Sequence, residues 1–230
     1  MLTGKFRSVV VVLLSLLVVT VTVAFATVTA TGISADEALQ HLLDGNKRYV
    51  SNQMSGQKLC DLPTREGLAK GQKPYAIILS CSDSRVPPEI IFDKGLGEIF
   101  VVRVAGNIVD SVVLGSIEYA AEHLGSPLVM VLGHERCGAV TAAVDAKGKP
   151  EGNIGAIIRS ITPAVKQARK EAVGKSKPEL VETAIDDNVK LVSASLTRQS
   201  KVLKHLVAEG KIKIVSAKYD LDDGNVTILK

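Results

Sequence analysis

The segment YAIILSCSDSR, residues 75–85, carries the pattern from which the fold class can be predicted. It joins an uninterrupted apolar run, Tyr75 to Leu79, to a polar segment that carries a thiol, a carboxylate and a guanidinium. Two further runs of strand length, Ile99 to Val104 and Leu128 to Leu132, are apolar in the same way, without the alternation of a half-exposed strand. Such runs are typical of strands that are buried on both faces of a parallel sheet. We therefore expect a parallel sheet covered by helices.

Helical patterns separate and follow these strands. Apolar spacing and capping residues predict helices over residues 34–52, 111–124 and 139–146, and over 155–209 with an interruption near 174–178. Residues 53–73 are expected to form a surface connection. Residues 212–219 and 226–229 are expected to form a hairpin around a turn at 222–224. The fold class is α/β, a single domain with a mainly parallel β-sheet flanked by helices and a C-terminal hairpin at the sheet edge.

Polar residues follow each of the three buried strands. Cys81 to Arg85 follows the first strand, Arg103 to Asn107 closes the second, and the segment GHERCG, residues 133–138, follows the third. Because ligands bind at the carboxyl ends of the strands in open α/β sheets, these segments are expected to meet there. Three segments that are far apart in the sequence are thus predicted to lie at the same edge of the sheet.

Three soft donors in these segments predict an open metal site. His134 and Cys137 are separated by two residues, and Cys81 arrives from a neighbouring strand. A Cys2His set leaves one tetrahedral position open, as catalytic zinc requires, whereas structural zinc takes four protein ligands. Two simpler interpretations stay open from the residues alone: a Cys81–Cys137 disulfide, or a His134 that caps a helix or bonds to a backbone carbonyl.

Asp83 and Arg85 are the candidate catalytic pair. Zinc lowers the pKa of a coordinated water and yields hydroxide near neutral pH. Asp83 could accept a hydrogen bond from that species and align it for attack, while the fork of Arg85 keeps Asp83 ionised and away from the metal. If Arg85 no longer binds Asp83, Asp83 is expected to become a fourth ligand of the metal and to close the site. The residues that contact substrate beyond this pair are not assigned.

The chain resembles the β-class carbonic anhydrases of bacteria. The resemblance rests on CSDSRVP at 81–87, RVAGN at 103–107, GSIEYA at 115–120, the Gly133-His134-x-x-Cys137-Gly138 motif and YDLDDG at 219–224. It implies a zinc enzyme that interconverts carbon dioxide and bicarbonate by attack of zinc-bound hydroxide. Cys81, His134 and Cys137 would hold one zinc per subunit, and Asp83 with Arg85 would form the catalytic pair. It also implies a homodimer or tetramer, with the N-terminal helix embracing the neighbouring subunit.

Several residues depart from the family pattern or lie outside it. Some bacterial members hold an inhibitory bicarbonate with Trp, Arg and Tyr; Arg103 and Tyr219 match, but the chain has no Trp, and Tyr49 is the candidate for its place. The pair Glu135 and Arg136 is expected to contact a partner subunit or to face solvent. Cys60 lies outside every motif and is interpreted as a spare thiol, with an intermolecular disulfide as the alternative.

The N-terminus predicts export. Lys5 and Arg7 precede an uncharged apolar run from Val9 to Phe25, and an Ala-Phe-Ala site ends at Ala26, the layout of a signal peptide. We therefore expect a signal peptide at 1–26, a short linker at 27–34 and a β-carbonic anhydrase-like catalytic domain at 35–230. The protein is expected to be periplasmic or secreted. The alternative is an uncleaved anchor, the only case in which we expect membrane contact.

Composition excludes a nucleic-acid partner. The net charge of +4 is small and dispersed, and four Phe, four Tyr and no Trp leave little for base stacking. Two alternative functions remain beside carbon dioxide hydration. One is a hydrolase of carbon disulfide or carbonyl sulfide on the same fold, and the other is a non-catalytic zinc- or bicarbonate-binding protein.

Overall fold

The computed structural model describes residues 31–56, 60–148, 150 and 152–230. The predicted signal peptide or anchor at 1–26 lies outside these residues. Within them, none of the helices combines the length and the apolar character needed to cross a membrane. In chain order the elements are α1 (Ala35–Val50), α2 (Leu62–Leu68), β1 (Ala76–Ser80), α3 (Pro88–Ile91), β2 (Ile99–Arg103), the 3-10 turn η2 (Ala105–Asn107), α4 (Ser111–Glu122), β3 (Leu128–His134), α5 (Gly138–Asp145), α6 (Ile154–Glu171), α7 (Lys177–Gln199), α8 (Lys201–Ala208), β4 (Lys213–Tyr219) and β5 (Val226–Leu229).

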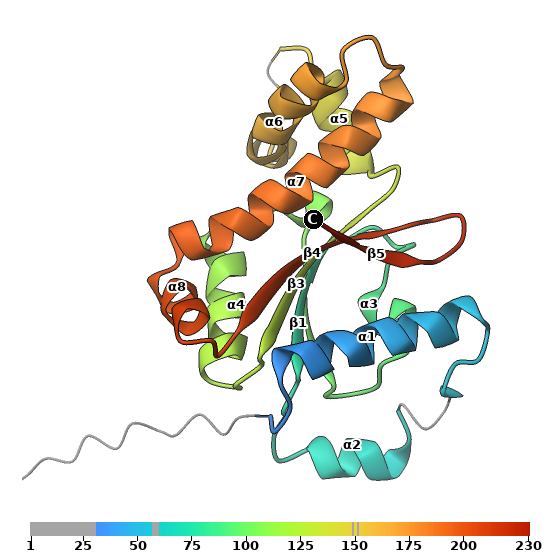
Figure 1. The fold of residues 1–230 in the computed structure, drawn as a ribbon, viewed down its shortest axis with the longest axis vertical. Coiled ribbons are helices and arrows are strands. Elements are labelled where there is room, and N and C mark those ends of the chain that lie inside the picture. Colours follow the sequence, from blue (N-terminus) through green and yellow to red (C-terminus); the bar gives the residue numbers. More distant parts are fainter. Residues whose placement is uncertain (1–30, 57–59, 149, 151) are drawn as a thin grey trace, which may run out of the picture.

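One five-stranded sheet, in the order β2-β1-β3-β4-β5, forms the centre of the molecule. The first four strands are parallel to their neighbours, and β5 pairs antiparallel with β4 at the edge. This confirms the α/β class, the mainly parallel sheet and the hairpin at its edge. Figure 1 shows the sheet between α4 and α8 on one side and α1 on the other, with α5 and α6 beyond its upper end.

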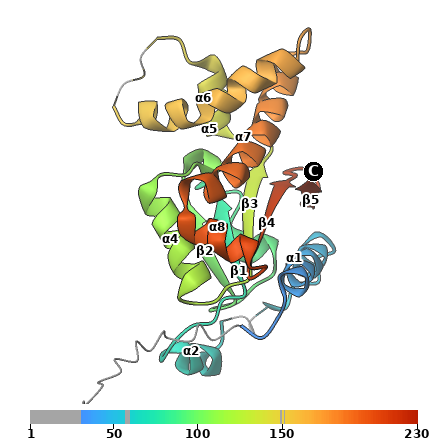
Figure 2. The ribbon, with the colours of Figure 1, turned by 60° about the vertical axis from the view of Figure 1, so that its left-hand side comes forward.

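The two faces of the sheet bury alternate residues of the same strands. Ile78 and Met130 face a core that includes Leu42 of α1, whereas Ile77 and Val129 face a core built with α4, α7 and α8. This explains why β1 and β3 are apolar at nearly every position, since each side chain is buried whichever way it points. The turned view in Figure 2 separates α1 from α4 and α8 on opposite faces.

Strand β2 differs from its prediction. Its first four residues are only partly buried and Arg103 is exposed, so the expected burial on both faces is wrong for Ile99–Arg103. The reason is its place at the sheet edge, where it pairs with β1 alone.

Two short helices appear that the sequence pattern did not predict. Residues 53–73, expected as a surface connection, contain α2, whose N-cap Asp61 accepts a hydrogen bond from the Thr64 N–H. α3 follows Pro87, and the predicted interruption of the long helical region is present between α6 and α7. The same region breaks once more at Ser200, which ends α7 and caps α8.

The N-terminal helix α1 packs onto its own subunit. Ala38 and Leu42 are fully buried, and the amide of Asn46 donates to the Ile91 and Gly224 carbonyls of the same chain. Ala38, Leu42 and Asn46 of α1 are thus buried within the same chain.

Candidate metal centre

Three buried donors converge at the carboxyl edge of the sheet. Cys81 follows β1, His134 ends β3, and Cys137 is the N-cap of α5. Their donor atoms lie within 4.8 Å of one another, and each residue is at most 4% exposed. The parallel register of β1 and β3 brings Cys81 and His134 together, although they are far apart in the sequence. The structure therefore assembles the predicted ligand set at the predicted edge.

The two thiols are free and in contact. Their sulfur atoms are 4.0 Å apart, so the disulfide alternative does not describe this structure. The hydrogen bond from Cys137 lowers the pKa of Cys81 well below its ordinary value, and the same contact raises the pKa of Cys137. The pair thus gives up its first proton readily and retains the second. A divalent cation that displaces the second proton would meet two thiolates.

The tautomer of His134 leaves one nitrogen available to a metal. Its Nδ1 lies 2.8 Å from the Glu135 carbonyl oxygen, which can only accept, so Nδ1 carries the proton. Nε2 is then a lone-pair donor, and it is buried without a hydrogen-bond partner. An orphaned buried acceptor beside two thiols fits a soft divalent metal, and zinc takes this donor set. The hydrogen bond between His134 and a backbone carbonyl, which was the alternative to metal binding, is therefore present. It leaves Nε2 available to a metal ion.

A carboxylate held by an arginine lies beside this donor set. Arg85 Nε and Nη2 donate to Asp83 Oδ1 and Oδ2 at 2.9 and 2.7 Å, and the Arg85 backbone N–H donates to Oδ1 at 3.0 Å. This fork holds the pKa of Asp83 well below its usual range. Asp83 Oδ2 is 3.9 Å from His134 Nε2, a contact between two acceptors at this tautomer. The carboxylate of Asp83, while bound by Arg85, thus lies next to the position that a metal ion held by the three donors would occupy.

Arg103 fixes the segment that carries both Cys81 and Asp83. Its Nε donates to the Cys81 carbonyl at 3.0 Å, and its Nη2 donates to the Asp83 carbonyl at 2.6 Å. The hydroxyls of Tyr49 and Tyr219 lie 3.0 Å apart. The two tyrosines that were compared with the bicarbonate-binding residues of some bacterial members are therefore in contact. The Arg103 guanidinium, in contrast, is directed to the backbone carbonyls of the ligand segment.

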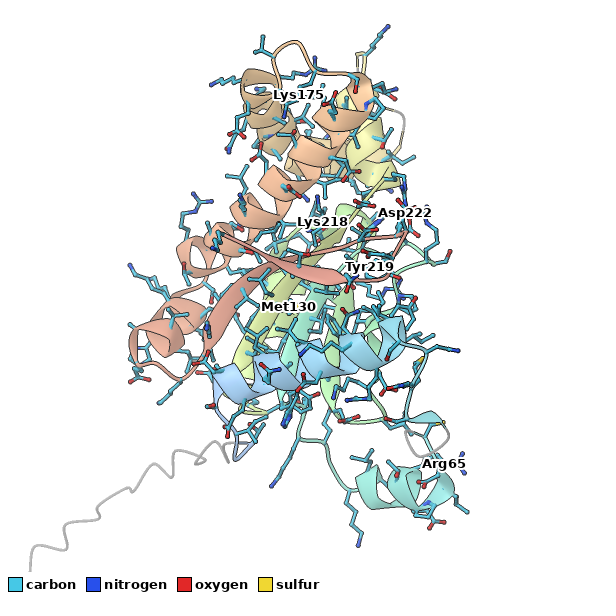
Figure 3. All side chains as sticks on the ribbon, turned by 45° about the vertical axis from the view of Figure 1, so that its right-hand side comes forward. Arg65, Met130, Lys175, Lys218, Tyr219 and Asp222 are labelled. Atoms are coloured by element: carbon cyan, nitrogen blue, oxygen red, sulfur yellow. The ribbon has the colours of Figure 1, made fainter. Side chains whose placement is uncertain are left out.

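Arg136 has a partner in its own chain that sequence reasoning missed. It adopts a positive φ of 49° between the candidate ligands His134 and Cys137. Its guanidinium forms a fork with Asp222, at 2.9 Å for both contacts, and its backbone N–H donates to Glu182 at 2.9 Å. Figure 3 shows Asp222 at the turn of the β4–β5 hairpin and Tyr219 near the end of β4. Arg136 therefore ties the ligand loop to the C-terminal hairpin.

Outside the donor set, Glu135, Asp220 and Asp222 form the other close group of potential ligands within the described residues, but Asp222 is bound by Arg136. Cys60 is exposed and forms no disulfide within the described residues of this chain.

Known proteins are similar to this chain in both sequence and fold. The family model described as carbonic anhydrase matches residues 76–226. Carbonic anhydrase 2 of Mycobacterium tuberculosis is 40% identical over 194 residues, which span 83% of this chain and 91% of that protein. The β-carbonic anhydrase of Aspergillus fumigatus superimposes with a TM-score of 0.69 at 27% identity, over 84% of this chain and 90% of its own. A tetrameric β-carbonic anhydrase of Sordaria macrospora does so with a TM-score of 0.66 at 23% identity, over 84% and 97%.

Proposed function

Because this chain belongs to the carbonic anhydrase family, we propose that it hydrates carbon dioxide at a zinc ion held by Cys81, His134 and Cys137. The observation that carries the proposal is the convergence of two free thiols and an unpartnered imidazole nitrogen beside an ionised carboxylate. Zinc bound by this set supplies a Lewis acid that activates water for attack on carbon dioxide.

Asp83 orients the attacking group. Its pKa lies well below its usual range because Arg85 donates to both of its oxygens, so it is ionised throughout the working pH range. An ionised carboxylate only accepts hydrogen bonds, so Asp83 can align a water or hydroxide with its lone pair toward carbon dioxide. The same low pKa prevents Asp83 from taking up the proton that hydration releases. Another group must carry that proton away.

Arg85 keeps Asp83 out of the metal position. The fork fixes the plane of the carboxylate, and two donors on one side leave the remaining lone pairs to face the donor set. We propose that loss of this fork frees Asp83 to become a fourth ligand and to close the site.

The variant Asp83→Asn tests this assignment. The amide keeps the shape of the side chain but replaces one acceptor by a donor, so zinc content should stay at one per chain while kcat falls by about 100-fold or more. Asp36→Asn is the matched control, since Asp36 also binds a cationic side chain, that of Lys213, but is 81% exposed and lies at the opposite end of the sheet. Full activity in Asp83→Asn, measured by stopped-flow hydration, would refute the role of Asp83.

We propose that the active form is a homodimer or a tetramer. β2 leaves one row of backbone donors and acceptors unpaired at the sheet edge, and nearby α4 exposes Val112 and Tyr119 at 75% and 48%. An unpaired edge beside exposed apolar side chains favours pairing with a second chain. Light scattering on the purified protein should give a dimer or larger. A monomer at micromolar concentration would contradict the proposal.

We also propose that the protein is exported, from the composition of residues 1–26. The check is the N-terminal mass of the protein recovered from fractionated cells. A mature form beginning after Ala26 in the periplasm or medium is expected, and a full-length protein in the cytoplasm would contradict export.

A further inference from the structure

The turn that follows β2 contacts the sulfur of Cys81. The Gly106 backbone N–H donates to Cys81 Sγ at 3.3 Å. A hydrogen bond to a thiolate withdraws charge from the sulfur, and so changes how strongly that sulfur donates to a metal. Gly106, in the RVAGN segment, therefore contacts Cys81 although it is not one of the predicted metal ligands.

This turn is held tightly by the helices around it. Gly106 has φ +73°, and a Cβ added there would lie 2.7 Å from Ile161 Cδ1 and 3.2 Å from Ala139 Cβ. Both the conformation and the close approach of α5 and α6 thus require glycine. Packing sets where the turn lies, and hydrogen bonds to its peptide groups help to set how those groups are rotated.

A buried side chain from α7 supplies that orientation. Asn188 is 2% exposed, and its Nδ2 donates to the Gly106 carbonyl at 2.9 Å. The contact joins residues 82 positions apart and ends on the residue whose N–H reaches Cys81. One continuous path therefore runs from Asn188 through Gly106 to the sulfur.

We propose that Asn188 is a positioning residue that keeps the Gly106 N–H directed at Cys81 Sγ and so sets the charge that this sulfur donates to the metal. Asn188 touches neither substrate nor metal and acts through Gly106. The inference rests on the proposed zinc site. Partners of metal ligands typically change metal affinity or activity by about 10- to 100-fold when they are removed.

Two variants remove the amide donor to different extents. Asn188→Leu keeps the size of the side chain, and the cavity of about 270 Å³ that Asn188 borders gives the new side chain room to settle. Asn188→Ser is smaller and disturbs the packing of α7 less. Zinc affinity is measured by competition with a chromophoric chelator, and the sulfur-to-metal charge-transfer band is recorded after substitution with cobalt.

We expect both variants to bind zinc about 10- to 100-fold more weakly, because the Gly106 N–H no longer holds the Cys81 sulfur in place, and this loss of positioning outweighs the stronger donation of a thiolate without that hydrogen bond. Their cobalt band should move to longer wavelength, because a thiolate that has lost a hydrogen bond holds its electrons less tightly. A purely structural role would lower stability without moving this band.

Ser126→Ala is the matched control. The Ser126 hydroxyl is fully buried and donates to the Pro74 carbonyl at 2.5 Å, ahead of β3 and β1 and therefore at the opposite end of the sheet. This variant should lose stability and keep the zinc affinity and the band of the wild type.

Three results would overturn or redirect the inference. Folded Asn188 variants with wild-type affinity and an unshifted band would overturn it, and so would failure of both variants to fold, which would make Asn188 purely structural. A wild-type protein that binds neither zinc nor cobalt would instead refute the proposed function.

Discussion

Asp187 of α7 should make the protein less stable as the pH rises. Its side chain is 4% exposed; Oδ1 accepts from Gln167 Nε2 at 3.0 Å, and Oδ2 has no partner. Burial raises the pKa of Asp187 to about 6 from 3.8, the carboxylate of Glu171 adds to this effect, and Lys190 opposes it. Ionisation of Asp187 is therefore unfavourable in the folded state.

The sign and size of the effect follow from the two pKa values. Below pH 3.8 the carboxyl is neutral in both states and costs nothing. Between 3.8 and about 6 the unfolded chain ionises first, so stability falls as the pH rises through this window. Above it, the difference in pKa converts, at about 1.4 kcal/mol for each pH unit, to a loss of about 3 kcal/mol.

The variant Asp187→Asn should recover this loss. It keeps an oxygen for Gln167 and removes the buried charge, so its free energy of unfolding in urea should exceed that of the wild type by about 3 kcal/mol at pH 8 and by less than 1 kcal/mol at pH 4. Both proteins are measured in the same metal state. Asp186→Asn is the control, since the Asp186 carboxylate lies 2.9 Å from Lys218 Nζ and should give no gain. An equal gain at both pH values, or a loss at pH 8, would contradict the raised pKa of Asp187.

Two further substitutions probe packing and metal binding. Gly45→Ala places a Cβ on top of the Phe92 carbonyl and should displace α1, at a cost of about 2 kcal/mol or more in urea unfolding, whereas Gly67→Ala in open space should gain up to about 1 kcal/mol; equal effects would contradict the packing of α1. Cys137→Ser should reduce zinc below one equivalent per chain by elemental analysis, while Cys60→Ser should keep it, and retention of zinc in both would exclude Cys137 as a ligand.

The sheet could be predicted because the residues within its central strands show a pattern that is typical of buried strands. β1 and β3 are apolar at nearly every position, a pattern typical of short strands that are buried on both faces. The edge position of β2 could not be predicted, because its residues look as apolar as those of a central strand. The order of strands is a property of the whole chain and leaves no local mark on Ile99–Arg103. α2 did leave a local mark, an Asp61 N-cap followed by Pro63, which the polar composition of the segment obscured.

Some residues of the candidate site could likewise be predicted from the sequence, and others could not. Cys81, Asp83, His134 and Cys137 lie at or within a few residues of the carboxyl ends of β1 and β3, so topology alone brings them together. Asn188 could not be found in this manner, because it lies in the middle of a long helix and its role depends on which side of α7 faces the η2 turn. The expectation for Arg136 missed its partner for a related reason: the hairpin turn that carries Asp222 folds back beside the ligand loop.

We propose that hydration requires zinc at the site of Cys81, His134 and Cys137, a claim that stopped-flow measurement of carbon dioxide hydration tests. The enzyme is assayed as purified, after removal of metal with a chelator, and after return of zinc. We expect the rate to disappear with the metal and to return fully at one zinc per chain. A rate that survives complete removal of zinc, or a protein that binds zinc and shows no zinc-dependent rate, would contradict the claim.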